Sequence, residues 1–210
     1  MIGGVYCQIP RTGSTLITAL LQQRSDVHMP MNSPLIEFLW QTQSLWGNPD
    51  FRVELSDPSI FYGREKIVQN MLHGFTETIA PGKIWIDKHW NWAATLNYSV
   101  MKEYYPSLKM FRTVRDWNEI EKSFDNTGYK YSKEKLKDIK RVQDSLTLPD
   151  DKLLTIEFRS IGNDLPSVMQ DLEQFLELPR FSYDFKKIEI DTSILDDLTS
   201  PKLNTLRRAA

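Results

Sequence analysis

Apolar residues along the chain recur in two alternating patterns. Short apolar runs, which predict strands, occupy residues 4–9, 83–87, 108–114 and 152–158, with a weaker run at 186–190. Between them, apolar residues recur at helical spacing over residues 14–24, 34–46, 64–79, 93–105, 117–126, 133–146 and 164–177. Strands and helices that alternate in this way are typical of an α/β protein in which helices cover both faces of a central, mostly parallel sheet.

Composition narrows the class of protein. The chain has 210 residues, 40% of them hydrophobic, which is enough to bury one core, and we expect residues 1–210 to form a single domain. The 26 Lys and Arg nearly balance the 28 Asp and Glu, so no overall positive field draws the protein to nucleic acid, and any anion site must be local. Cys7 is the one cysteine, no apolar run approaches a membrane span of about 20 residues, and the first ten residues lack a signal-peptide pattern. These features predict a cytoplasmic protein.

The segment "PRTGST" (10–15) directly follows the first predicted strand and leads into a predicted helix. Ligands of parallel sheets gather beyond the carboxyl ends of the strands, and the free N–H groups of a helix start suit an oxyanion. Gly13 lets the backbone approach the anion closely, while Thr12, Ser14 and Thr15 add hydroxyl donors. The alternative is an ordinary turn in which Ser14 is only the helix N-cap.

The lysine of a triphosphate-binding loop is missing from this segment. The pattern G-x-x-x-x-G-K-[ST], set on Gly13, requires glycine at position 8 and lysine at position 14, where this chain has Gln8 and Ser14. The basic residue is instead Arg11, before the glycine. The segment therefore departs from the triphosphate-binding pattern at two positions.

A second candidate anion site follows the strand at 108–114. Arg115 follows this strand, and Ser123 lies eight residues later on the next predicted helix. An arginine fork and a hydroxyl together bind a terminal phosphate well. Taken alone, the motif favours the alternative of a surface ion pair at Arg115 with Ser123 exposed to solvent, and it favours the anion site once it is paired with the loop at 10–15. We expect Asp116 to cap the helix or to orient Arg115, and Arg112 to face the other side of the strand.

These motifs resemble a known family. "IPRTGSTLITALL" resembles the 5′-phosphosulfate loop of sulfotransferases that use 3′-phosphoadenosine-5′-phosphosulfate (PAPS), closest in style to the tyrosyl-protein and carbohydrate branch. The strand, Arg-Asp and Ser of "MFRTVRDWNEIEKSF" resemble that family's 3′-phosphate motif. The resemblance implies a P-loop NTPase-like three-layer fold, PAPS as donor without a required metal, and transfer to a hydroxyl or amine of a small-molecule, carbohydrate or peptide acceptor. The donor would be held by Arg11, Thr12, Gly13, Ser14, Thr15, Arg115 and Ser123.

Lys88 and His89 follow the strand at 83–87, so they are expected at the same edge of the sheet as Arg11. The resemblance implies that Lys88 stabilises the transferring group together with Arg11. Two residues are candidates for the general base: His89, whose ordinary pKa of about 6.5 suits the role, and Glu37, in an early helical turn. Where the tyrosyl-protein branch has its glutamate base, this sequence has Asn32.

Other features leave alternatives open. The tryptophans near residue 90 are core residues by default, although flat apolar faces also suit an acceptor pocket. Lys202, Arg207 and Arg208 lie in a terminal tail that the family often folds over the cofactor, but a frayed terminus is the simpler interpretation. Two other functions compete: a P-loop small-molecule or nucleotide kinase, disfavoured by Ser14 at the lysine position, and a non-catalytic cofactor-binding module.

Overall fold

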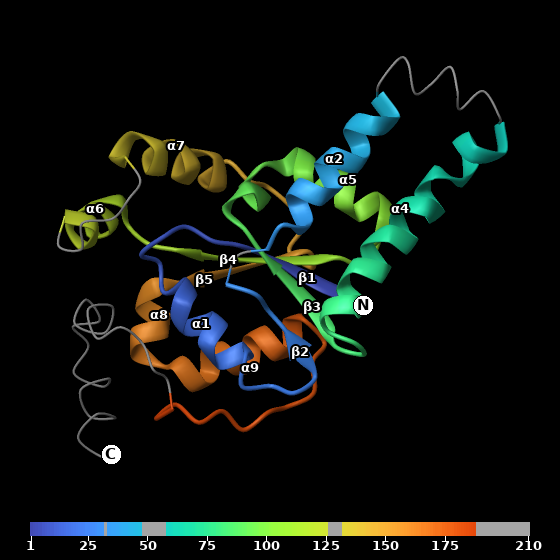
Figure 1. The fold of residues 1–210 in the computed structure, drawn as a ribbon. Coiled ribbons are helices and arrows are strands. Elements are labelled where there is room, and N and C mark those ends of the chain that lie inside the picture. Colours follow the sequence, from blue (N-terminus) through green and yellow to red (C-terminus); the bar gives the residue numbers. More distant parts are fainter. Residues whose placement is uncertain (32, 48–57, 126–131, 188–210) are drawn as a thin grey trace.

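The computed structural model describes residues 1–31, 33–47, 58–125 and 132–187. Its centre is a five-stranded sheet in the order β2-β3-β1-β4-β5, and every strand pairs with its neighbours in parallel (Figure 1). The strands are β1 (Ile2–Cys7), β2 (Val27–His28), β3 (Ile84–Lys88), β4 (Lys109–Val114) and β5 (Leu153–Glu157). Because β1 lies between β3 and β4, the residues that follow these three strands meet at one edge of the sheet.

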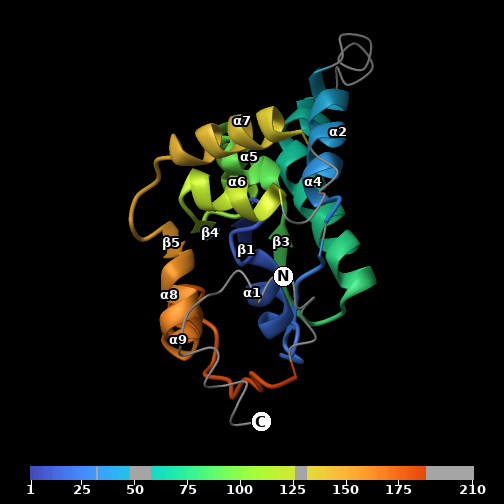
Figure 2. The same ribbon diagram turned by 90° about the vertical axis from the view of Figure 1, so that its left-hand side faces the viewer.

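Helices cover both faces of this sheet, which makes three layers (Figures 1 and 2). One face carries α1 (Ser14–Leu21), α8 (Phe158–Asn163) and α9 (Leu165–Phe175), and the other carries α2 (Leu35–Gly47), α4 (Pro58–Ile79) and α5 (Thr95–Tyr104). A 3-10 turn, η1 (Trp90–Ala93), joins β3 to α5, while α6 (Trp117–Asp125) and α7 (Lys133–Asp144) follow β4. The predicted α/β arrangement is confirmed.

The two sides of the core follow the alternation of strand side chains. Tyr6 stacks on Phe111 with ring centroids 4.3 Å apart, and both pack against α1, α8 and α9. Val5 and Met110 point to the opposite face, into the cluster formed with α2, α4 and α5. A third cluster contains Ile9 and residues of α6 and α7. The strand β1, buried at every position except Gly3, therefore forms a rigid base for the loop that follows it.

The structure differs from the sequence prediction in several elements. The first strand occupies Ile2–Cys7 rather than 4–9, because pairing with β3 begins at Ile2 and the chain leaves the sheet after Cys7. The short β2 and α8 were not predicted, and the helix expected over 164–177 ends at Phe175. Of the weak strand expected at 186–190, Lys186 and Lys187 are not in a strand, and the other positions lie outside the described residues.

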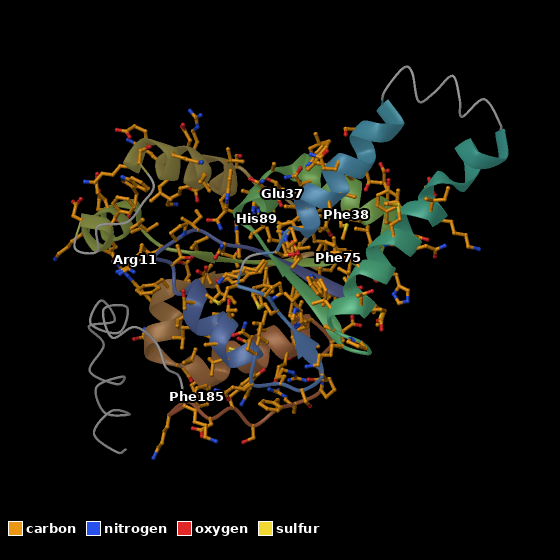
Figure 3. All side chains as sticks on the ribbon, in the orientation of Figure 1. Arg11, Glu37, Phe38, Phe75, His89 and Phe185 are labelled. Carbon is orange, nitrogen blue, oxygen red and sulfur yellow. The ribbon has the colours of Figure 1, made fainter. Side chains whose placement is uncertain are left out.

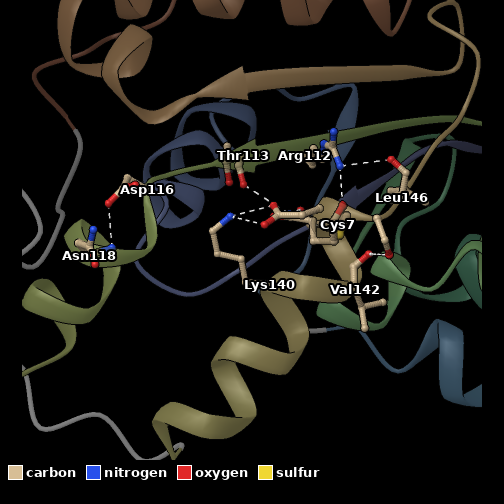
Figure 4. A network of polar contacts seen from close by, with 11 residues as sticks. Cys7, Arg112, Thr113, Asp116, Asn118, Lys140, Val142 and Leu146 are labelled. Atoms are coloured by element: carbon tan, nitrogen blue, oxygen red, sulfur yellow. Dashed lines mark hydrogen bonds and ion pairs between the residues drawn. The ribbon is translucent and has the colours of Figure 1, made fainter.

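A polar network ties α7 to the sheet (Figure 4). Arg112 of β4 donates from Nε to the Thr155 hydroxyl of β5 (3.0 Å) and from Nη1 to the carbonyl oxygen of Gln143 in α7. The buried Gln143 side chain donates in turn to the carbonyl oxygen of Cys7 (3.1 Å). Arg112 thus has a structural role, because it joins α7 to β5.

Candidate active site

The loop between β1 and α1 has an unusual backbone at two positions. Arg11 has a φ of 68° and Gly13 a φ of 84°, both in the left-handed region. Gly13 is the N-cap of α1, and its carbonyl oxygen accepts from the Ile17 N–H (3.2 Å). Ser14 is the first helical residue, so the alternative that made Ser14 the N-cap is wrong. The loop turns sharply into the helix and leaves the first N–H groups of α1 at its apex.

Buried hydroxyl groups hold this loop in place through hydrogen bonds. Thr12 is fully buried, donates its hydroxyl to the Ile9 carbonyl oxygen (2.8 Å) and lies 2.6 Å from the Thr113 hydroxyl. The Tyr6 hydroxyl lies 2.9 Å from the same Thr113 oxygen. Burial raises the pKa of Tyr6, so this phenol stays neutral. The hydroxyl of Thr12 therefore holds the loop in shape, while Ser14 and Thr15 remain the hydroxyls nearest the helix start.

The two predicted anion motifs meet in the structure. Arg11 donates from Nε to the Ser123 hydroxyl (2.7 Å), and Arg115 donates from Nη1 to the Arg11 carbonyl oxygen (3.0 Å). Ser123 is buried in α6, and Asp116 caps the start of that helix by accepting from the Asn118 N–H (2.8 Å), as expected. Segments about a hundred residues apart in sequence thus form one continuous site.

Three residues that the sequence did not suggest surround Arg115. Its guanidinium lies 3.9 Å from the centroid of the Phe158 ring, and its Nε donates to Glu119 Oε2 (3.3 Å). Arg159 also pairs with Glu119 (2.9 Å). These residues line a cavity of about 280 Å³. The Arg115 side chain is only 8% exposed, so its ion pair is not the surface pair considered as an alternative. Glu119 lies four residues after Arg115, in the first turn of α6.

Lys88 is a buried cation at the end of β3. It is 1% exposed, and its Nζ lies 6.0 Å from the centroid of the Tyr6 ring, the residue beside it on β1. Burial lowers the pKa of Lys88 to about 8. No carboxylate within the described part of the chain forms an ion pair with it. A buried amine without a counter-ion favours an incoming anion.

Glu37 and His89 lie together (Figure 3). His89 Nε2 is 3.4 Å from Glu37 Oε1, and His89 Nδ1 accepts from the Asn91 N–H (3.1 Å). The Asn91 side chain also donates to Glu37 Oε1 (3.5 Å). Because Nδ1 accepts a hydrogen bond, a neutral His89 carries its proton on Nε2, which faces Glu37. Figure 3 places Arg11 apart from this pair.

Asp87, the acidic residue of β3, has a structural role. Asp87 is fully buried and accepts from the indole N–H groups of Trp92 (2.7 Å) and Trp85 (3.3 Å), and burial raises its pKa.

Within the described ranges, no group of three or more metal-ligating side chains is found. None of the described helices is long and apolar enough to cross a membrane. Asn32 and the tail with Lys202, Arg207 and Arg208 lie outside the described residues.

Solved structures share this fold. The sulfotransferase domain of the olefin synthase of Synechococcus PCC 7002 superposes with a TM-score of 0.59 at 16% identity, over 97% of this chain and 79% of that chain. The sulfotransferase domain of the curacin biosynthetic pathway gives a TM-score of 0.53 at 16% identity, over 92% and 83%. A sulfotransferase from Alicyclobacillus acidocaldarius gives 0.51 at 13% identity, over 99% and 94%. These similarities confirm the P-loop NTPase-like fold.

Sequence comparison is more specific about ancestry. No curated protein sequence matches the chain significantly. A sequence model of the sulfotransferase family matches residues 7–183. These residues include the loop after β1, the end of β3 and the motif after β4. The chain therefore belongs to the sulfotransferase family.

Proposed function

We propose that this protein transfers a sulfuryl group from PAPS to a hydroxyl or amine acceptor, with residues 1–210 acting as one domain. The observation that carries the proposal is the joining of two anion motifs through the Arg11–Ser123 and Arg115–Arg11 hydrogen bonds. A continuous site with two arginines fits a ligand with phosphate at two positions of one nucleotide better than it fits a simple monophosphate. The family assignment supports the same conclusion.

The proposed chemistry needs little from the protein beyond position and charge. The acceptor oxygen or nitrogen forms a bond to sulfur as the bond between sulfur and the phosphate oxygen breaks, and the bisphosphate departs with that electron pair. Free N–H groups at the start of α1, together with Arg11, would hold the 5′-phosphate. Lys88 would meet the negative charge that develops on the departing oxygen. Arg115 and Ser123 would hold the 3′-phosphate.

Glu37 is the better candidate for the general base. The Nδ1 atom of His89 accepts from the Asn91 backbone, and its Nε2 faces Glu37, so a neutral His89 has no free acceptor nitrogen for the substrate proton. The half-exposed Glu37 carboxylate has oxygen lone pairs left to accept a proton. His89 would then orient Glu37. This assignment remains a proposal alongside that of His89 as the base.

The kinase alternative predicts a different requirement. A phosphoryl-transfer enzyme of this fold uses a lysine where this chain has Ser14, and it needs Mg²⁺. Transfer that proceeds in the presence of a metal chelator would therefore exclude the kinase. Donor binding without turnover on a broad acceptor panel would favour the non-catalytic module.

The donor assignment is tested by thermal shift with adenosine 3′,5′-bisphosphate and AMP, because a ligand that binds the folded state raises the melting temperature. The bisphosphate is expected to stabilise the protein more than AMP does. Arg115→Ala should remove this difference. The loss of its charged hydrogen bonds to the ligand should weaken the binding free energy of the bisphosphate by about 1.5–3 kcal/mol. Arg180→Ala is the matched control, since Arg180 is a 63% exposed arginine in the segment that follows α9. Equal shifts by AMP and the bisphosphate in the wild-type protein would refute the donor assignment.

A further inference from the structure

A second cavity, of about 330 Å³, lies between η1 and α7 and is separate from the Arg115 cavity. Its walls are mainly apolar and come from Trp90, Ala93 and Ala94 on one side and from Ile139 and Val142 on the other. Val142 is 39% exposed, so the cavity opens to solvent along α7. Its volume is at the lower end of the range for small-molecule sites.

The polar end of this cavity connects to Glu37. Asn91 lines the cavity and donates its side-chain N–H to Glu37 (3.5 Å). Asn97 also lines it and accepts from the indole N–H of Trp40 (2.8 Å), one turn after Glu37 on α2. The Trp90 ring stacks on His89 with centroids 5.5 Å apart. A molecule that enters between η1 and α7 therefore lies against Asn91 and Trp90, which in turn contact Glu37 and His89.

We infer that this cavity binds the apolar body of the acceptor, and that the acceptor is a small hydrophobic alcohol or phenol. The inference rests on the proposed function. In the reaction, the acceptor oxygen bonds to sulfur, the sulfur–phosphate oxygen bond breaks, and the acceptor proton passes to the Glu37 carboxylate. The products are a sulfate ester and the bisphosphate.

The lining selects against the other acceptor classes. A sugar would lose hydration at several hydroxyl groups against Ala93, Ala94 and Val142, where no partners replace the water. A flat ring or an alkyl chain instead gains contact with the Trp90 face. Lys135 and Asp138 bring opposite charges to the same cavity, so its lining favours neither an anionic nor a cationic acceptor.

The test measures sulfuryl transfer from labelled PAPS to each of three acceptors: 2-naphthol, 1-octanol and methyl glucoside. The wild-type protein is expected to sulfate one or both apolar alcohols with a kcat/KM at least about tenfold above that for methyl glucoside. Val142→Phe fills the cavity from α7 and should raise the KM for these alcohols at least about tenfold. Lys137→Phe, at an exposed position of α7 that does not line the cavity, is the matched control and should leave KM unchanged.

The thermal shift with bisphosphate separates the two proposals. A normal shift in Val142→Phe shows that the variant is folded and binds the donor product, so a raised KM then reports on the acceptor cavity. Ala94→Leu fills the cavity from the opposite wall and replaces Val142→Phe if that variant does not fold. A wild-type protein that binds bisphosphate but prefers methyl glucoside, or that sulfates neither alcohol, overturns the inference and leaves the donor assignment standing. An unchanged KM in a folded cavity-filling variant also overturns it.

Discussion

At the scale of single residues, the loop after β1 depends on backbone positions that most side chains disfavour. Arg11 holds a positive φ as a non-glycine residue, and such conformations persist where the surrounding structure determines them. Here the Arg11 carbonyl oxygen accepts from Arg115, and its side chain donates to Ser123. The same contacts that join the two anion motifs therefore also hold the strained residue in place.

Gly13 carries a second constraint, crowding, which substitution can measure. A Cβ at Gly13 would lie 2.9 Å from Ile161 Cδ1 and 3.3 Å from the Phe158 ring, at a φ of 84°. Gly13→Ala should cost the left-handed penalty of about 1–2 kcal/mol and an additional amount for displacing the Ile161 and Phe158 side chains. It should also weaken bisphosphate binding. Urea unfolding and the thermal shift measure the two effects.

Gly82→Ala is the control for this prediction. Gly82 has a φ of 68°, but a Cβ there meets no heavy atom within 4 Å, so the variant tests backbone strain alone. It should lose less unfolding free energy than Gly13→Ala and keep its bisphosphate shift. If the two variants lose the same free energy, crowding against Ile161 contributes nothing.

At the scale of elements, the sequence predicted what long periodic segments reveal. Four of the five strands in the described chain were predicted, because buried apolar runs are visible locally, as is the spacing from Arg115 to Ser123. The two residues of β2 are too few to show alternation, and the six of α8 are fewer than two helical turns. Phe158 and Arg159 escaped detection for a different reason. They lie next to Arg115 only because β5 pairs with β4, and this long-range pairing cannot be seen in the local sequence.

The attachment of α7 can be tested at the same scale. Arg112 binds carbonyl oxygens at the carboxyl end of α7 and the Thr155 hydroxyl of β5. Arg112→Met keeps most of the apolar stem but leaves these acceptors without their donor, so the unfolding free energy should fall by about 1.5–3 kcal/mol. Because α7 forms one wall of the cavity beside Trp90, the KM for an apolar alcohol should rise as well. Arg141→Met, on the exposed side of α7, should change neither quantity, and equal effects of both variants would contradict this role.

At the scale of the whole molecule, a net charge of −2 means that anion binding depends on a few placed cations. Arg11, Arg115 and Lys88 come from three separate segments that the parallel sheet brings to one edge. Lys88 differs from the arginines, because its charge is buried without a carboxylate partner in the described chain. A site of this kind is less stable empty than a neutral one, and an anion removes that cost.

This cost makes stability depend on pH in a defined window. The pKa of Lys88 is about 8 in the folded protein and close to 10.5 in the unfolded chain. Between these values the unfolded chain binds more protons, so the contribution of Lys88 to the unfolding free energy rises as pH increases from about 8 to 10.5. Below pH 8 the penalty is fully present. Lys88→Met should therefore be more stable than wild type at pH 7, by roughly 3 kcal/mol, with the gap closing toward pH 10.5.

Under the proposed function, bisphosphate binds next to the charged form of Lys88, so its affinity should show the opposite dependence on pH. As pH rises above about 8, wild-type protein must take up a proton to bind this ligand, so its affinity should fall by up to about tenfold per pH unit. Lys88→Met should bind more weakly at pH 7 and show no such decline. Urea unfolding and bisphosphate titrations of both proteins from pH 7 to 10 measure these curves. Parallel curves for the two proteins would mean that Lys88 stays protonated throughout, and its proposed part in meeting the charge of the departing phosphate would lose its physical basis.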